Sequence, residues 1–144
     1  MTGDDFKEAC GLLERFFAEE GFRASPAQIR TRLLAMLNDE ASTAFLAWAD
    51  GLAVGIATVT TSYGIELGLS AELEDLYVQP EARGRGAGSI LIEAVQDWCR
   101  ERGCTLVSIV VTPEGQAAHN LIDYHRARGF EETGRMILFA HLGR

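Results

Sequence analysis

Apolar side chains recur at intervals of three and four residues in four parts of the chain, which is the spacing of one buried face of an α-helix. The pattern predicts helices over residues 4–20, 26–37, 89–102 and 113–128. Glycines follow the first, third and fourth of these segments, at positions 21, 103 and 129. Ser25 before Pro26 is a typical start for the second. We therefore expect four amphipathic helices.

Shorter apolar runs between the helices are typical of strands. They predict strands over residues 42–50, 52–62, 72–78, 104–111 and 135–142. The Asp50-Gly51 pair is a strong signal for a hairpin turn between the first two. The run at 104–111 is almost continuously apolar, as expected of a strand covered on both faces. Residues 63–71 are expected to form a loop.

The order of these elements is two helices, three strands, helix, strand, helix, strand. A strand–helix–strand unit implies a parallel pair joined by a right-handed crossover, whereas the hairpin before it is antiparallel. The length of 144 residues suits one domain, spanning residues 1–144. We therefore expect a single mixed sheet with helices on both faces.

The formal net charge of −8 at pH 7 limits the partners of this chain. Nucleic acid binding needs a basic footprint, so we expect no nucleic-acid partner. The acidity is compatible with a cationic small-molecule substrate, although acidity also serves simply to keep a protein in solution. No apolar run approaches the about 20 residues that cross a bilayer, so we expect no membrane partner.

The cysteines and the N-terminal residues indicate in which cellular compartment the protein is expected. Cys10, Cys99 and Cys104 are odd in number and lack the spacing of metal ligands, which favours free thiols, no metal site and a reducing environment. The first residues, MTGDDFKEAC, carry acids where a signal peptide carries bases. We therefore expect a cytoplasmic protein.

A loop of arginines and glycines, RGRGAG at 83–88, lies between the third predicted strand and the third predicted helix. Backbone N–H groups at the start of a helix converge on anions, and the helix dipole adds partial positive charge there. Glycines keep Cβ atoms out of the way, and arginines can reach phosphate oxygens. The loop lacks the Lys-Ser/Thr ending of a P-loop and does not open the first crossover of a dinucleotide fold. It predicts a phosphate-bearing cofactor other than a nucleoside triphosphate or NAD.

The stretch LYVQPEARGRGAGSILIEAV, residues 76–95, resembles the acyl-CoA signature of the GCN5-related N-acetyltransferase family. That signature is Arg/Gln-x-x-Gly-x-Gly/Ala between a strand and a helix, and Arg83, Gly86 and Gly88 fit it. The resemblance runs from about residue 70 to residue 130. It implies acetyl-CoA as cofactor and a single-domain α/β (α+β) fold. In that fold the sheet is mixed and mostly antiparallel, with a central parallel strand pair and helices on both faces.

The same resemblance implies which residues bind CoA. Main-chain groups at the end of the third strand would hold the pantetheine arm: Leu76, Tyr77 and Val78. The following loop and helix start would contact the phosphates: Arg83, Gly84, Arg85, Gly86, Ala87, Gly88 and Ser89. The family often has an asparagine farther on that contacts the pantetheine arm, and Asn120 is the candidate for it here.

Three acidic side chains, Glu72, Glu74 and Asp75, lie on the third predicted strand. In the family the amine attacks the thioester directly, so an ammonium ion must first lose a proton. The similarity to the strand of diamine and polyamine acetyltransferases implies that these acids bind the amine, with Glu74 as the preferred catalytic group. Strict alternation would point Glu74 and Asp75 to opposite faces, unless a bulge intervenes. A solvated acidic face is the structural alternative.

The leaving thiolate needs a proton, and the family takes it from a tyrosine before a Gly-Phe pair. Anchored on Gly129 and Phe130, the match places His125 at the tyrosine position and Tyr124 just before it. Either side chain could be the general acid, and His125 could instead be a histidine packed against the sheet. His119 and His141 have no constellation around them and are expected to be structural or exposed.

These features predict an acetyl-CoA-dependent N-acetyltransferase whose acceptor is a small cationic amine, aminoglycoside-like or polyamine-like. The aminoglycoside case implies antibiotic resistance. A protein or peptide N-acetyltransferase is one alternative, and a non-catalytic CoA-binding regulatory module, suggested by the replaced tyrosine, is another. The acceptor site is expected from the two N-terminal helices and residues 60–70. A homodimer through the terminal strand would be common for this family.

Overall fold

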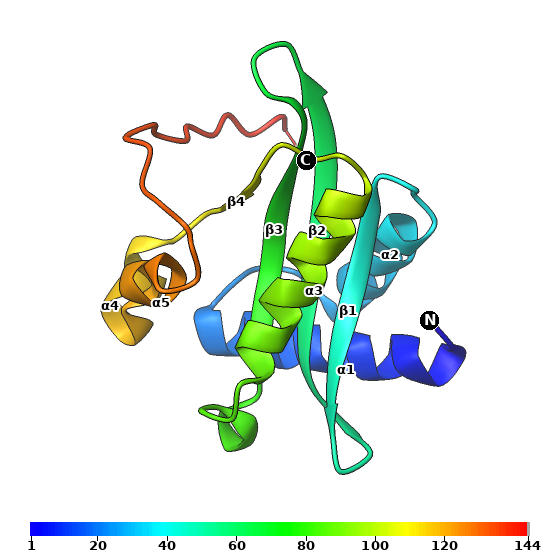
Figure 1. Ribbon diagram of the computed structural model, residues 1–144. Coiled ribbons are helices and arrows are strands. Elements are labelled where there is room, and N and C mark those ends of the chain that lie inside the picture. Colours follow the sequence, from blue (N-terminus) through cyan, green and yellow to red (C-terminus); the bar gives the residue numbers. More distant parts are fainter. Residues whose placement is uncertain (144) are drawn as a thin grey trace.

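The computed structural model describes residues 1–143 and contains a sheet between layers of helices (Figure 1). The helices are α1 (Gly3–Glu20), α2 (Pro26–Leu37), α3 (Ala87–Glu101), α4 (Pro113–His119) and α5 (Leu121–Arg126), with a 3₁₀ turn at Pro80–Ala82. The strands are β1 (Ser42–Ala49), β2 (Leu52–Gly64), β3 (Gly68–Val78) and β4 (Val107–Ile109). The first three predicted helices and the first three predicted strands are confirmed.

Both N-terminal helices begin with a reciprocal pair of hydrogen bonds. The Thr2 hydroxyl accepts from the Asp5 backbone N–H, and the Asp5 carboxylate accepts from the Thr2 N–H. Ser25 and Gln28 repeat the arrangement at the start of α2. Each pair satisfies backbone donors that the first turn of a helix leaves free, which fixes where the two helices start.

The strands follow the order β1-β2-β3-β4, antiparallel except for the parallel pair β3–β4 at one edge. Asp50 and Gly51 join β1 to β2 with φ values of 52° and 78°, as a two-residue type I′ hairpin requires. α3 crosses from β3 to β4 over one face of the sheet, while α1 and α2 lie on the other (Figure 1). The mixed sheet with helices on both faces is confirmed.

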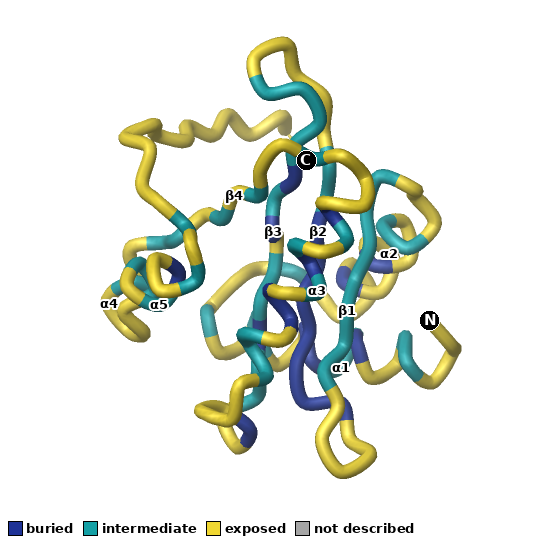
Figure 2. The backbone as a smooth tube through the Cα atoms, in the orientation of Figure 1, coloured by how far each residue is buried: buried dark blue, intermediate teal, exposed yellow. Residues whose placement is uncertain are grey.

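An apolar cluster lies on each face of the sheet, and Figure 2 shows how burial concentrates along β2, β3 and the inner sides of the helices. The cluster beneath α1 and α2 consists of Ala9, Leu12, Leu13, Ile29, Leu33, Ala53, Ile56 and Tyr77. The cluster beneath α3 consists of Ala57, Val59, Ala71, Leu73, Leu91, Ile92, Val95 and Cys99. Neighbouring residues of β2 and β3 thus serve opposite faces, as strand alternation requires.

The predicted loop at 63–71 is wrong in extent. Pairing between β2 and β3 continues to Gly64 opposite Gly68, so that only residues 65–67 form the turn. Tyr63 is 83% exposed because the end of this hairpin projects beyond the helices (Figure 1). The apolar residues at positions 63, 65, 67, 69 and 71 alternate with small or polar residues, which is the period of a strand, so the sequence did contain a signal for the longer pairing.

The prediction of a long buried strand at 104–111 is also wrong. Only Val107–Ile109 pair, and with β3 alone, because β4 is the edge strand. Leu106 and Val110 are 39% and 42% exposed. Residues 135–142, predicted as the last strand, form no strand, and the bidentate ion pair of Arg135 with Glu66 holds the start of that segment to the β2–β3 hairpin.

The single helix predicted over 113–128 is two helices, α4 and α5. Asn120 lies between them with φ 49°, a left-handed conformation that asparagine tolerates better than most residues. The Gln116 side chain closes the break, because its amide donates to Asn120 Oδ1 and its carbonyl accepts from the Ile122 N–H. None of the described helices is both long enough and apolar enough to cross a membrane.

Candidate active site

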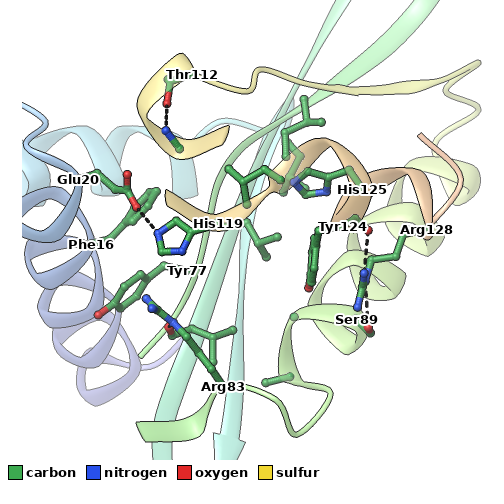
Figure 3. A pocket seen from close by; sticks show the side chains of 18 of the residues that line it. Phe16, Glu20, Tyr77, Arg83, Ser89, Thr112, His119, Tyr124, His125 and Arg128 are labelled. Carbon is green, nitrogen blue, oxygen red and sulfur yellow. Dashed lines mark hydrogen bonds and ion pairs between the residues drawn. The ribbon is translucent and has the colours of Figure 1, made fainter. Parts of the chain in front are cut away.

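A cavity of about 490 Å³ opens where β3 and β4 diverge. The two strands pair only as far as Leu73 opposite Ile109, after which β3 continues to Val78 without β4 beside it. The cavity fills this wedge, between the end of β3, the end of α1, the start of α3 and the helices α4 and α5 (Figure 3). Residues 76–78 line it, which is where the sequence predicts the pantetheine arm.

The start of α3 presents free backbone N–H groups to this cavity. Gly86 is the N-cap, and among the described residues no side chain caps the helix. The Ile90 N–H donates to the Gly86 carbonyl, so the N–H groups of residues 87–89 have no partner within the helix. Gly84 and Gly86 have φ values of 79° and 88°, which only glycine adopts without strain. Free donors and the helix dipole make this an anion-binding end.

Arg83, the first residue of the predicted CoA motif, is tied to the end of α1. Its guanidinium forms an ion pair with Glu19, in which Nη2 donates to both carboxylate oxygens at 3.0 and 2.8 Å. Its Nε–H donates to the Val78 carbonyl at 2.8 Å, and the group lies 5.7 Å from the centre of the Tyr77 ring. Arg83 therefore links its loop to α1 and to the end of β3, while Arg85 is exposed on the loop.

A β-bulge in β3 decides where the predicted acids point. Thr58 and Val59 are consecutive on β2, yet they pair with Asp75 and Leu73, so that Glu74 is an extra residue. The inserted residue shifts the alternation by one. Glu74 and Asp75 consequently point to the same face of the sheet, which resolves the alternative that the sequence left open.

Threonines of β2 hold both carboxylates on the face that α1 and α2 cover. Thr58 Oγ1 donates to Asp75 Oδ2 and Thr60 Oγ1 donates to Glu74 Oε2, each at 2.5 Å. Ile56, two residues before Thr58, belongs to the cluster beneath α1 and α2. Because alternate residues of a strand share a face, both carboxylates lie on this side.

The environments of the three acids differ. Burial raises the pKa of the Asp75 carboxyl, against the opposing effect of the hydrogen bond from Thr58. Burial, and then the neighbouring charge of Glu74, raises the pKa of Glu72. Glu74 is exposed and lines the cavity, whereas Asp75 and Glu72 lie outside its wall. Glu74, which lines the cavity, therefore has two neighbouring carboxyl groups with increased proton affinity.

α5 brings Tyr124 to the wall opposite α1 (Figure 3). The Tyr124 hydroxyl lies against Gly88, in the first turn of α3. The Arg128 guanidinium stacks on the Tyr124 ring, 3.5 Å from its centre, and donates to Ser89 Oγ at 3.0 Å and to the Tyr124 carbonyl at 2.7 Å. These contacts fix the phenol beside the anion-binding end of the cavity.

His125 borders the same cavity but is packed as a core residue. It is 3% exposed, and its Nδ1 has no hydrogen-bond partner among the described residues. Its ring contacts Tyr124 and Phe130 edge-on, with centroids 5.1 and 5.4 Å apart. Burial, and then the charge of Arg128, lowers the pKa of His125. The imidazole is therefore neutral at pH 7.

Asn120, predicted to contact the pantetheine arm, lies outside the cavity wall. Its side chain holds the junction of α4 and α5, where its amide donates to Asp123 and its carbonyl accepts from Gln116. Asn120 thus positions α5, and with it Tyr124. A contact with the cofactor stays a prediction.

Two long-range contacts at the end of α1 were not predicted from the sequence. Glu19 binds Arg83, and the Glu20 carboxylate lies 3.4 Å from Nε2 of His119 on α4 (Figure 3). His119, predicted to be structural or exposed, therefore lies in the cavity wall with a partner. The partners in each pair lie far apart in sequence, so no local motif could have indicated them.

Comparison with protein families gives one match across most of the chain. The family model described as "Acetyltransferase (GNAT) family" matches residues 7–130. Among individual proteins, the aminoglycoside N(6')-acetyltransferase type 1 of Stenotrophomonas maltophilia is 41% identical over 108 residues. That match spans 72% of this chain and 69% of the relative, so it covers about two thirds of the relative's length.

Solved structures of the same kind share the fold. Aminoglycoside N-acetyltransferase AAC(6')-Iy in complex with CoA superposes with a TM-score of 0.81 at 27% identity, covering 99% of this chain and 91% of that one. The same enzyme in complex with a bisubstrate analogue, CoA-S-monomethyl-acetylneamine, gives a TM-score of 0.79 at 28% identity over 98% and 94% of the two chains.

Proposed function

Because the chain belongs to the acetyltransferase (GNAT) family, and is therefore an N-acetyltransferase that uses acetyl-CoA, we propose that it acetylates an amino group of an aminoglycoside. One arrangement carries the proposal: Glu74 and Tyr124 line the same cavity from different walls, next to the uncapped start of α3. The relatives named above are aminoglycoside acetyltransferases, which favours this acceptor over a polyamine.

The residues around the cavity suit acetyl-CoA. Free N–H groups at 87–89 are donors for the phosphates, and Gly84 and Gly86 let the backbone approach them closely. The edge of β3 at 76–78, left without β4, is available for the pantetheine arm. Acetyl-CoA supplies the acetyl group as a thioester when it is bound. Arg83, held by Glu19, acts by joining the loop to α1, with its guanidinium facing the cavity.

Glu74 and Tyr124 have the chemistry that acetyl transfer to an amine requires. Glu74 binds the acceptor ammonium and takes its proton, directly or through water, and the raised pKa values of Glu72 and Asp75 favour passing that proton onward. Tyr124 gives its proton to the leaving thiolate. A neutral, buried His125 is a poor proton donor, and its role is to pack α5.

The acceptor side of the cavity favours a small polycation over a peptide. Glu20 and Glu74 line it, and Phe16, Phe22 and Tyr77 add aromatic walls. Carboxylates beside aromatic faces suit ammonium groups on a sugar scaffold. The alternative of a non-catalytic CoA-binding module was suggested by the histidine, His125, at the family's tyrosine position. It loses that support, because Tyr124 reaches the cavity.

Turnover tests this proposal. Thiol release from acetyl-CoA is measured with an aminoglycoside, a polyamine and a basic peptide as sole acceptors. We expect the aminoglycoside to give the highest kcat/KM. A preference for the peptide would support the protein acetyltransferase alternative, and CoA binding without turnover of any amine would support the regulatory one.

We also propose that the chain forms a homodimer through its C-terminal segment and acts in the cytoplasm. Five large apolar side chains of that segment are 57–95% exposed: Met136, Ile137, Leu138, Phe139 and Leu142. An apolar surface of this kind is typical of an interface, and the free edge of β4 offers a second copy's segment a strand to pair with. Free Cys10, Cys99 and Cys104 favour a reducing compartment.

A further inference from the structure

The C-terminal end of α1 carries two acids that helix stability does not explain. Glu19 and Glu20 occupy the last turn, which contains no basic residue. The negative end of the helix dipole disfavours carboxylates at this position. Glu19 has an evident role, since both of its carboxylate oxygens accept from Nη2 of Arg83. Glu20 lacks such a role and points into the cavity from the α1 wall (Figure 3).

The partner of Glu20 is a loose one. The 3.4 Å between the Glu20 carboxylate and His119 Nε2 exceeds the about 2.7–2.9 Å of a charge-assisted hydrogen bond. The Glu20 side chain is 16% exposed and that of His119 is 37% exposed, so the carboxylate is the more enclosed of the two. His119 is the last residue of the seven-residue helix α4 and precedes the left-handed Asn120. A side chain at such an end can turn away without disturbing the core.

The other positive groups of the cavity wall are already bound elsewhere. Arg83 is neutralised by Glu19, and Arg128 donates to Ser89 and to the Tyr124 carbonyl. A ligand ammonium group that enters on the α1 side therefore encounters the Glu20 carboxylate. The His119 imidazole is the only group that it must displace there. Glu74, the other acid of the wall, lies on β3 and not on this helix.

We propose that Glu20 is a second acceptor-binding carboxylate, which binds an ammonium group other than the one that is acetylated. His119 fills the place of that ammonium group when no acceptor is bound. This inference rests on the proposed function and adds to it a selection rule: acceptors with several amines bind through Glu20 and Glu74 together, whereas a monoamine engages Glu74 alone.

Two acceptors of matched reacting group test the rule. Neamine carries several amino groups, and 6-amino-6-deoxyglucose carries one. We expect Glu20→Gln to raise the KM of neamine by on the order of tenfold, which corresponds to about 1.4 kcal/mol. The KM values of 6-amino-6-deoxyglucose and of acetyl-CoA should stay unchanged. Glu14→Gln removes the same charge from an exposed position of α1 and should leave all three KM values as they are.

The variant His119→Ala distinguishes two roles of His119: competing with the acceptor ammonium group for Glu20, or holding α4 against α1. If His119 only holds α4 against α1, its loss should weaken both acceptors and lower the Tm. On our proposal His119→Ala instead lowers the KM of neamine, and this effect disappears in the Glu20→Gln background. An equal change for both acceptors with Glu20→Gln, or no change for neamine, would overturn the assignment.

Failure of the proposed function is distinguishable from failure of this inference. If the wild-type protein acetylates neither amine, the proposed function is wrong. Calorimetric titration of neamine into the wild-type and Glu20→Gln proteins then still tests the Glu20 site, because binding needs no turnover. Equal affinity of the two proteins for neamine would contradict the inference by itself.

Discussion

The hydroxyl of Tyr124 occupies the space that a side chain at position 88 would need. Gly88 lies in the first turn of α3, where the backbone N–H groups are free, so this contact brings a phenol to the anion-binding end of the cavity. His125, its neighbour in sequence, is turned into the packing around Phe130. Successive residues of a helix differ by about 100° in direction, and only one of the two can reach the same point.

Tyr124 is therefore expected to be the general acid. Tyr124→Phe keeps the ring and its contact with Arg128 but removes the proton, and should lower kcat by on the order of a hundredfold. His125→Ala should mainly lower the Tm, because it empties a buried site. Steady-state kinetics across pH, with a slow and a fast acceptor, measure both effects. Near-wild-type turnover in both variants would mean that water protonates the thiolate, and a large loss of kcat only in His125→Ala would restore histidine as the acid.

Gly86→Val should raise the KM for acetyl-CoA much more than the KM for the acceptor. A valine at φ 88° strains the loop and places a side chain beside the N–H groups at 87–89. Gly103→Val is a matched control, because Gly103 has φ 79° just beyond the other end of α3. It should lower the Tm comparably without changing the KM for acetyl-CoA. Normal CoA affinity of folded Gly86→Val by calorimetry would refute the assignment of the loop.

Glu74→Gln and Asp75→Asn should weaken acceptor binding and leave acetyl-CoA affinity nearly unchanged, since each removes a negative charge near a cationic ligand. Glu74→Gln should have the larger effect, because Glu74 lines the cavity and Asp75 lies behind it. Glu101→Gln, at the exposed end of α3, serves as the charge control. Unchanged acceptor kinetics in both strand variants would move the acceptor site to Glu66 or to the N-terminal helices.

Asp75 should make stability depend on pH. Its pKa is raised in the folded protein, so the folded state binds this proton more tightly than the unfolded chain does. The stabilisation is complete below the ordinary pKa of aspartate, about 3.9, and is lost as pH rises through the raised value. Asp75→Asn should consequently raise the Tm at pH 7, with a gain that shrinks as pH falls toward 4. A lower Tm of Asp75→Asn at pH 7 would mean that the hydrogen bond from Thr58 outweighs burial.

The exposed C-terminal segment should set the oligomeric state. Leu138→Asp with Phe139→Asp puts charges on side chains that are 89% and 80% exposed, and should convert a dimer into a monomer in light scattering after size exclusion. Ile65→Asp alters a fully exposed apolar residue of the β2–β3 turn and should leave the mass unchanged. A wild-type protein that is monomeric at micromolar concentration would disprove the proposed dimer.

Some parts of the molecule follow from local sequence. The first two helices, the Asp50-Gly51 hairpin and α3 with its glycine-rich start are fixed by apolar spacing, caps and backbone preferences that operate within a few residues. The acyl-CoA motif lies within one such stretch, which is why the family and the cofactor could be predicted without a structure. The direction of Glu74 could not, because a single inserted residue in β3 reverses the face of everything after it.

The tertiary structure alone decided the rest, for two physical reasons. An apolar run does not show what its side chains contact, so residues 104–111 and 135–142 were predicted as strands although only Val107–Ile109 pairs. Ion pairs between distant parts of the chain leave no trace in local pattern, because their strength depends on separation in space. The contact of Glu20 with His119 forms because the divergence of β3 and β4 brings α4 opposite the end of α1, and the pair of Glu19 with Arg83 forms because the loop after β3 lies beside the same helix end.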